Sequence, residues 1–259
     1  MTQEEKRQFL IKSLIAEDEG LRGIDVPPQP DGQRQLLRAL MNIRAPRRIG
    51  NDFLQVQDEY LHDETEARGV TDIAQLTPVQ PGLYIWQGDI TTLRCDAIVN
   101  AANSGLTGCY VPNHRCIDNA IHTFAGTQLR LCCAELMQKQ GHPEPTGQAK
   151  ITPAFNLPCR YVLHTVGPII EGRVTRRDEE LLASCYRACL ELAAENGLES
   201  VAFCCISTGE FHFPNELAAQ IAVRTVKEFL AKKTAVKKVI FNVFKEKDRA
   251  IYERLLGAN

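Results

Sequence analysis

The sequence predicts an α/β fold, because short apolar segments alternate with longer amphipathic segments from Leu83 onward. The segments LYIWQG, DAIVNAAN and VAFCCIS have the length and composition of strands, and the last two are continuous enough for buried ones. The segments between them carry apolar residues at helical spacing. Alternating strands and helices build a sheet that is covered by helices. We therefore expect a three-layer α/β/α sandwich, preceded by an N-terminal helical extension.

The expected extension covers residues 1–76 and carries three apolar stripes. The stripes lie at 10–15, 36–41 and 53–61, and three prolines separate the first two. Their spacing predicts helices. Because an apolar stripe on a helix needs a partner surface, we expect the extension to pack on a main domain that covers residues 77–259.

The main domain is expected to alternate strands and helices along the chain. Gly197 follows one helical segment, and Pro214 stands at the first turn of the next, which are typical end and start signals. The turn NLPCR joins two neighbouring strands. The expected strands are 83–88, 96–103, 149–155, 161–167, 201–207 and 237–244, and the expected helices are 117–140, 178–196, 214–232 and a last one at the C-terminus.

Composition and charge exclude several classes of protein. Hydrophobic residues make up 44% of the chain and charged residues 24%, which is typical of globular proteins rather than disordered ones. The net charge of −2 lacks the basic excess of a general nucleic-acid binder. No apolar run approaches the ~18 residues of a membrane span, and the N-terminus has no signal-peptide core. We expect a cytoplasmic protein that binds neither nucleic acid nor membranes.

The chain has ten cysteines, of which Cys95 is the first, and without an export signal they indicate reduced thiols or metal ligands rather than disulfides. Cys109, His114 and Cys116 form a C-x4-H-x-C pattern, and two thiolates with one imidazole suit Zn²⁺. No fourth ligand lies at adjacent spacing, and three protein ligands with one open position are the catalytic arrangement. The alternative is a loop that holds these residues without a metal. We expect Zn²⁺.

Small polar residues follow several of the expected strands. Asp89 and Asn103 come after two of them, and the glycine-containing segment 206–211 comes after a third. Ligands of open α/β sheets bind at the carboxyl ends of strands, and such loops suit phosphate oxygens. Ordinary turn chemistry produces the same residues. Asp118 begins the next helix, where it is either an ordinary first-turn acid or a catalytic carboxylate.

Five ordered motifs resemble those of macrodomains, which are ADP-ribose-binding α/β modules with a mixed central sheet. The insertion GCYVPNHRC is similar to the metal loop of zinc-containing macrodomains, which are protein mono-ADP-ribosyl hydrolases with an N-terminal helical extension. In the commoner macrodomains a run of glycines precedes the helix of the CIDNAIHTFAG motif, and here the metal loop stands in its place. His212 stands where glycine is frequent in those proteins. The five motifs are QGDIT, IVNAAN, CIDNAIHTFAG, TGQAKITPAFNLPCRYVLHTVGP and CISTGEFHFP.

The resemblance implies a role for each matching residue. Asp89 accepts from the adenine amino group, Ile90 offers its backbone N–H, and Asn103 lies at the distal ribose. Asn103 and Asp118 are the implied catalytic residues, which orient the attacking water. The residues that wrap the diphosphate are Ser207, Thr208, Gly209, Glu210 and Phe211, and those that hold Zn²⁺ beside the distal ribose are Cys109, His114 and Cys116.

The implied activity is zinc-dependent removal of mono-ADP-ribose from modified proteins, by cleavage of the bond at C1 of the distal ribose. A non-catalytic ADP-ribose reader and an O-acetyl-ADP-ribose deacetylase are the alternatives. Zinc could activate water or hold a ribose hydroxyl, and its two thiolate ligands favour the second role because they neutralise its formal charge. The resemblance also suggests a macrodomain-linked sirtuin and a lipoyl-carrier protein as partners.

Overall fold

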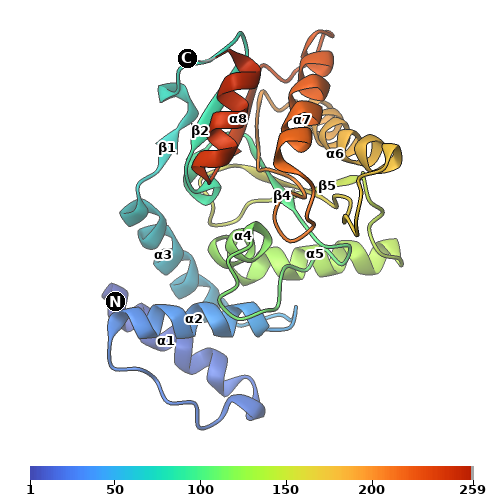
Figure 1. The fold of residues 1–259 in the computed structure, drawn as a ribbon. Coiled ribbons are helices and arrows are strands. Elements are labelled where there is room, and N and C mark those ends of the chain that lie inside the picture. The colour runs from blue at the N-terminus through green and yellow to red at the C-terminus, as the bar shows by residue number, and fades with distance from the viewer. Residues whose placement is uncertain (258–259) are drawn as a thin grey trace.

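A six-stranded mixed sheet forms the centre of the main domain in the computed structural model, which describes residues 1–257 (Figure 1). Every neighbouring pair is parallel except β5 and β6, which are antiparallel. The predicted mixed sheet is confirmed. In spatial order the strands are β2 (Leu83–Gln87), β8 (Lys238–Val243), β7 (Ser200–Phe203), β4 (Ala97–Ala101), β6 (Tyr161–Thr165) and β5 (Ala149–Pro153).

Helices cover both faces of this sheet, so the predicted three-layer architecture is confirmed (Figure 1). Helices α6 (Arg176–Glu195), α7 (Asn215–Leu230) and α8 (Glu246–Leu256) pack against one another on one face. Helices α4 (Ile117–Ala125) and α5 (Thr127–Gln140) cover the other face, where they contact β4 and β5.

The expected single helix over 117–140 is wrong, because the chain breaks at Gly126 between α4 and α5. Gly126 has a φ of 93°, which residues with a side chain rarely adopt. The side chain of Gln57, from the extension, fills the space beside it and accepts a hydrogen bond from the backbone N–H of Thr127 at 2.9 Å. The extension thus supplies an N-terminal cap for α5.

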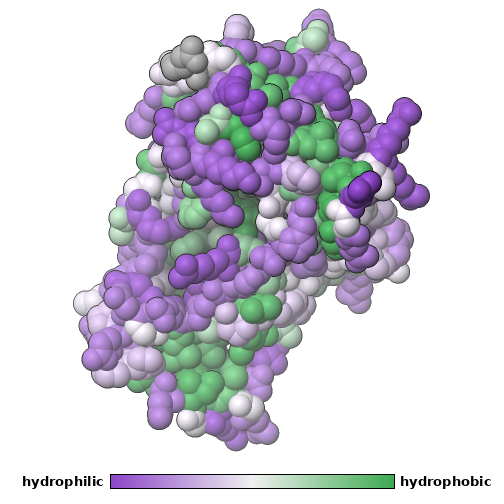
Figure 2. All heavy atoms as spheres, in the orientation of Figure 1, coloured by the Kyte–Doolittle hydropathy of each residue, from purple (hydrophilic) through white to green (hydrophobic). Residues whose placement is uncertain are grey.

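The extension folds into three helices with an apolar core of their own. These are α1 (Gln3–Ala16), α2 (Pro30–Ile43) and α3 (Asn51–Arg68). Their buried side chains form a cluster separate from the main core, and α2 and α3 contact α4. Figure 2 shows a mostly hydrophilic face, with apolar atoms gathered over the extension at its lower end. The extension therefore contacts the main domain, as predicted, but its apolar stripes pack against one another rather than on that domain.

Short elements connect the extension to the sheet. Strand β1 (Thr71–Asp72) pairs in parallel with β3 (Leu93–Arg94), and Ile73 and Leu76 pack against the main core. Among residues 1–257, no helix combines the length and the hydropathy that crossing a membrane requires.

Replacement of Leu10 by alanine is expected to destabilise the extension. Leu10 lies in the centre of the separate core and is 0% exposed, so its removal should lower the free energy of unfolding by about 2–5 kcal/mol. Urea unfolding followed by circular dichroism measures this. The matched control is Lys12→Ala on the exposed side of the same helix, which should change stability by less than about 0.5 kcal/mol. Wild-type stability in Leu10→Ala would contradict the expected packing.

Candidate active site

The predicted site residues gather at one edge of the sheet. Asp89 follows β2, Asn103 follows β4 and Ser207 follows β7. Because these strands all run in the same direction, their carboxyl ends lie at the same edge. The loops after them form the candidate site.

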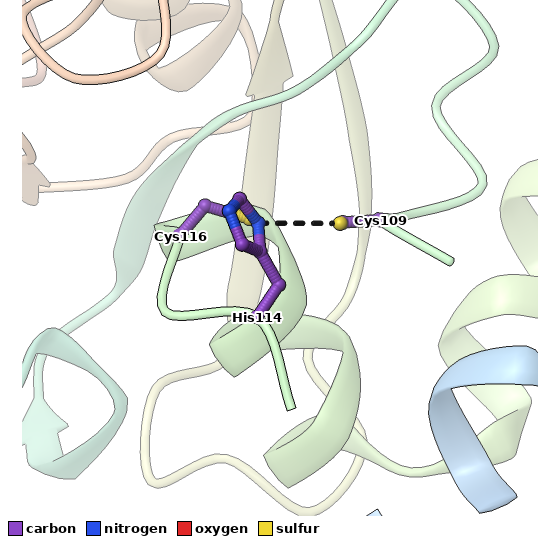
Figure 3. A group of neighbouring side chains, drawn as sticks. All are labelled: Cys109, His114 and Cys116. Atoms are coloured by element: carbon purple, nitrogen blue, oxygen red, sulfur yellow. Dashed lines mark hydrogen bonds between the residues drawn. The ribbon is translucent and has the colours of Figure 1, made fainter. Parts of the chain in front are cut away.

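Cys109, His114 and Cys116 come together in the loop between β4 and α4, which we call the metal loop (residues 109–116; Figure 3). Their ligand atoms all lie within 4.8 Å of one another, and Cys109 Sγ is 3.5 Å from His114 Nδ1. Figure 3 shows the imidazole beside both sulfur atoms. Two thiols and one imidazole suit Zn²⁺, so the three residues fit one ion by chemistry and by proximity.

Cys116 also caps helix α4. Its Sγ accepts a hydrogen bond from the backbone N–H of Asn119 at 3.4 Å. Burial raises the pKa of the Cys116 thiol to about 12, and the neighbouring Cys109 acts in the same direction. A nearby cation is the usual means of holding a buried sulfur as a thiolate.

Asp118 lies in the first turn of α4 and is only 5% exposed. Its Oδ1 accepts from Asn100 Nδ2 at 2.8 Å, and its Oδ2 accepts from Asn103 Nδ2 at 3.3 Å. Burial raises the pKa of Asp118 to about 6, although these two hydrogen bonds oppose the shift. The two residues predicted to be catalytic are therefore in direct contact.

Two buried histidines, His122 and His164, lie near Asp118. His164 Nδ1 is 3.2 Å from Asn100 Nδ2, and its Nε2 is 2.9 Å from Thr152 Oγ1. His122 Nε2 is 3.6 Å from Asp118 Oδ1, which is too long for a hydrogen bond, and neither ring nitrogen of His122 has a partner among the described residues. Burial lowers the pKa of His164 to about 3 and that of His122 well below its usual value. Both rings are neutral near pH 7.

The segment 207–211, which we call the diphosphate loop, presents unpaired backbone donors. Within residues 1–257, no acceptor takes the N–H of Gly209, Glu210 or Phe211. Ser207 has a left-handed φ of 64°, and a Cβ on Gly167 would overlap its Oγ, so the loop lies tightly against the end of β6. Free N–H groups on a constrained loop suit the oxygens of an anion.

The diphosphate loop and the metal loop touch each other. Glu210 Oε1 lies 3.6 Å from His114 Nε2. Two segments that are about a hundred residues apart in the sequence therefore form one continuous wall of the site. The position of a metal next to the diphosphate and the distal ribose, which the resemblance implies, stays a prediction.

Asp89 lies at the opposite end of the site and is held on both oxygens. Its Oδ1 accepts from the Thr91 backbone N–H at 2.9 Å, and its Oδ2 accepts from Arg68 at 2.8 Å. The guanidinium of Arg68 stacks on the ring of Phe124, 3.6 Å from the ring centroid. The backbone N–H of Ile90 has no acceptor among the described residues, so it is free for a ligand.

Sequence reasoning missed two residues at this end of the site. Arg68 is the last residue of α3, and no motif marks it because it meets Asp89 only after the extension has packed. Phe244 directly follows β8 and is 75% exposed at the same edge of the sheet. An exposed aromatic ring at the carboxyl end of a parallel strand was the available signal, but the sequence pattern assigns Phe244 to the strand itself.

The Macro domain family model matches residues 99–222 of the chain. A protein-ADP-ribose hydrolase of Treponema medium is 58% identical over 261 residues, which cover 99% of this chain and 100% of the relative. A protein-ADP-ribose hydrolase of Staphylococcus aureus is 46% identical over 248 residues, which cover 95% of this chain and 93% of the relative.

Solved structures agree with this match. A Trypanosoma brucei macrodomain in complex with ADP-ribose has a TM-score of 0.66 at 32% identity, with 85% of this chain and 95% of that chain covered. An Oceanobacillus iheyensis macrodomain with ADP has a TM-score of 0.63 at 38% identity, with 71% and 94% covered. The chain therefore belongs to the macrodomain family, and the relatives that match it almost from end to end are protein-ADP-ribose hydrolases.

The buried histidines predict a loss of stability in mild acid. The pKa of His164 is about 3 in the folded chain but about 6.5 when unfolded, so only the unfolded state takes up the proton between these values. Stability should therefore fall as the pH drops below 6.5, by up to about 1.4 kcal/mol per pH unit for each such histidine.

Urea unfolding at pH 7, 6 and 5 measures this slope. His164→Gln removes the titrating ring. The slope of the unfolding free energy against pH should therefore decrease by the contribution of about one proton. His142→Gln, in an exposed loop, is the matched control and should leave the slope unchanged. An identical slope in His164→Gln and the wild type would contradict the prediction.

Proposed function

We propose that the chain is a zinc-dependent hydrolase that removes mono-ADP-ribose from modified proteins by cleaving the bond at C1 of the distal ribose. The chain is a hydrolase that acts on ADP-ribosyl linkages, since it is 46–58% identical to protein-ADP-ribose hydrolases over nearly its whole length. The observation that carries the zinc dependence is the cluster of Cys109, His114 and Cys116, which leads directly into the buried Asp118.

The contacts of Asn103 support a single reaction centre. Its Nδ2 donates to the Gly108 carbonyl at 3.1 Å, next to the metal loop, and to Asp118 Oδ2 at 3.3 Å. Asn103 therefore joins the first metal-ligand residue to the carboxylate. A ribose bound beside Asn103 would meet both, while the free N–H groups of 209–211 bind the diphosphate and Asp89 receives the adenine amino group.

The chain's own residues divide the work of hydrolysis. Cleavage breaks the bond between C1 and the protein side chain, and positive charge develops on the ribose as the bond breaks. Asp118 faces this charge as a buried carboxylate and, with the Asn103 amide, orients a water molecule toward C1. The water oxygen bonds to C1, and its proton passes by way of Asp118 to the departing side chain.

Zn²⁺ fits the donor set of Cys109, His114 and Cys116, and when bound it supplies an electrophilic centre that orients and polarises a ribose hydroxyl. A non-catalytic reader needs neither an open metal position nor a buried carboxylate at the reacting end. The metal loop therefore favours hydrolysis over simple recognition.

Incubation of the chain with a mono-ADP-ribosylated protein, followed by detection of free ADP-ribose, tests the proposal. Release of ADP-ribose identifies the hydrolase. Retention of ADP-ribose on the protein, despite tight binding, would indicate a reader. A chain that releases acetate from O-acetyl-ADP-ribose but no ADP-ribose from the protein would be a deacetylase.

Replacement of Cys116 by alanine is expected to abolish zinc binding and hydrolysis together. Loss of an outer-shell partner typically lowers metal affinity or activity about 10–100-fold, so loss of a direct ligand should lower the rate of ADP-ribose release by at least that factor. Zinc content by atomic absorption and product release are measured on the same samples. Cys132→Ala, on α5 and outside the site, is the matched control. A metal-free Cys116→Ala chain with full activity would contradict the proposed zinc dependence.

Replacement of Asp89 by alanine is expected to weaken ADP-ribose binding, because the adenine amino group loses its acceptor. A hydrogen bond to a charged group is worth about 1.5–3 kcal/mol, so the dissociation constant should rise roughly 10- to 150-fold. Calorimetric titration with ADP-ribose measures it. Asp52→Ala, an exposed acid in the first turn of α3, is the control. Unchanged affinity in Asp89→Ala would refute the adenine role.

A further inference from the structure

We propose that Arg38 of helix α2 is a positioning residue of the metal site, so that the helical extension is a working part of that site. The inference rests on the proposed zinc function of the metal loop. Arg38 donates to the backbone carbonyl of His114 at 3.0 Å and makes two hydrogen bonds to Asn119 Oδ1, at 2.8 and 3.2 Å. One guanidinium thus contacts His114, which is one proposed metal ligand, and Asn119, which contacts the other two.

Asn119 connects Arg38 to the remaining ligands. Its backbone N–H donates to Cys116 Sγ at 3.4 Å, and its side-chain Nδ2 lies 3.5 Å from the Cys109 carbonyl. The same Nδ2 donates to the Val111 carbonyl at 3.1 Å. Because Arg38 takes the amide oxygen, the amide nitrogen must face the metal loop. Arg38 therefore fixes the orientation of a fully buried amide that contacts the backbone or sulfur of both cysteines.

A second residue of α2, Asn42, stabilises the turn that orients His114. Asn113 precedes His114 and has a left-handed φ of 55°, a conformation that costs energy unless its surroundings enforce it. Its backbone N–H donates to Asn42 Oδ1 at 3.0 Å, and Asn42 in turn donates to Thr123 Oγ1 at 3.0 Å. Arg38 and Asn42 lie one helical turn apart, so a single face of α2 supports this end of the loop.

Charge adds to this geometric support. Two thiolates neutralise the formal charge of a divalent zinc ion, and the Arg38 guanidinium brings one further positive charge close to Cys116. Arg38 therefore supports the ligands through its hydrogen bonds, without itself being a ligand.

Contacts other than those of Arg38 also hold the extension on the main domain. Helix α2 is also held at its C-terminal end by Arg130 of α5, which donates to the carbonyls of Met41, Asn42 and Arg44 at 3.1, 2.6 and 2.8 Å. Removal of the Arg38 side chain should consequently disturb the metal loop more than the packing of α2.

Zinc affinity, measured by competition with a chromogenic chelator on the full chain, tests the proposal. Arg38→Ala should weaken zinc binding by about 10–100-fold, the usual effect of losing an outer-shell partner. Arg38→Lys keeps the charge but cannot make the paired hydrogen bonds, so it should restore only part of the affinity. Arg34→Ala, one turn earlier on α2 and paired with the exposed Asp31, should bind zinc like the wild type. Wild-type affinity in a folded Arg38→Ala chain would overturn the proposal.

Melting temperatures with excess zinc and with excess chelator separate positioning from bracing. Positioning predicts that the rise in Tm on adding zinc shrinks in Arg38→Ala while the Tm in chelator changes little. An equal fall under both conditions, with unchanged zinc affinity, would mean that Arg38 only braces the fold and would overturn the inference. In Co²⁺-loaded samples, the visible absorption bands should shift in Arg38→Ala and stay fixed in Arg34→Ala.

These measurements also distinguish the proposed zinc function from the proposed role of Arg38. A wild-type chain that binds no zinc refutes the proposed zinc function and this inference with it. A wild-type chain that binds zinc and releases ADP-ribose, beside an Arg38→Ala chain with the same zinc affinity and the same Co²⁺ spectrum, refutes the role of Arg38 alone.

Discussion

The buried guanidinium of Arg130 joins the three parts of the molecule on which the site depends. Arg130 lies on α5, and its side chain collects three carbonyl oxygens at the C-terminal end of α2. It also stacks on Tyr110 of the metal loop, 4.3 Å from the ring centroid. A buried charge is costly without partners, and the unpaired carbonyls at the end of a helix are suitable ones. Movement of the extension would remove these three acceptors, and movement of the metal loop would remove the stacking on Tyr110.

A series of hydrogen-bonded polar groups extends from Asp118 across the sheet. Asp118 accepts from Asn100, which also lies beside His164, and His164 reaches Thr152 on strand β5. These groups are buried, so each depends on its neighbour to replace the water that it lost on folding. Because the histidine rings are neutral, Asp118 is the charged member of this hydrogen-bonded series, and its second oxygen accepts from Asn103.

Much of the fold and part of the site follow from the sequence because they depend on local patterns. The strands of the sheet are short apolar runs, and the three proposed metal ligands lie within eight residues of one another, so their proximity needs no knowledge of packing. Asp118 is two residues further on and begins a helix. The segment 117–140 has one continuous helical pattern, and its break at Gly126 depends on Gln57 from the extension, which no local pattern contains.

The same limit explains why the cations of the site could not be predicted. Arg38 and Arg68 meet their partners across 81 and 21 residues, from helices that have their own apolar core and reach the site only by packing on the main domain. Their positions matter because the diphosphate loop offers backbone N–H groups rather than basic side chains, and Asp89 adds a negative charge to the site. An anionic ligand would approach this carboxylate unfavourably if Arg68 did not offset it. The net charge of −2 is therefore compatible with an anionic ligand, since Arg68 and Arg38 of the extension place positive charge beside Asp89 and near Cys116.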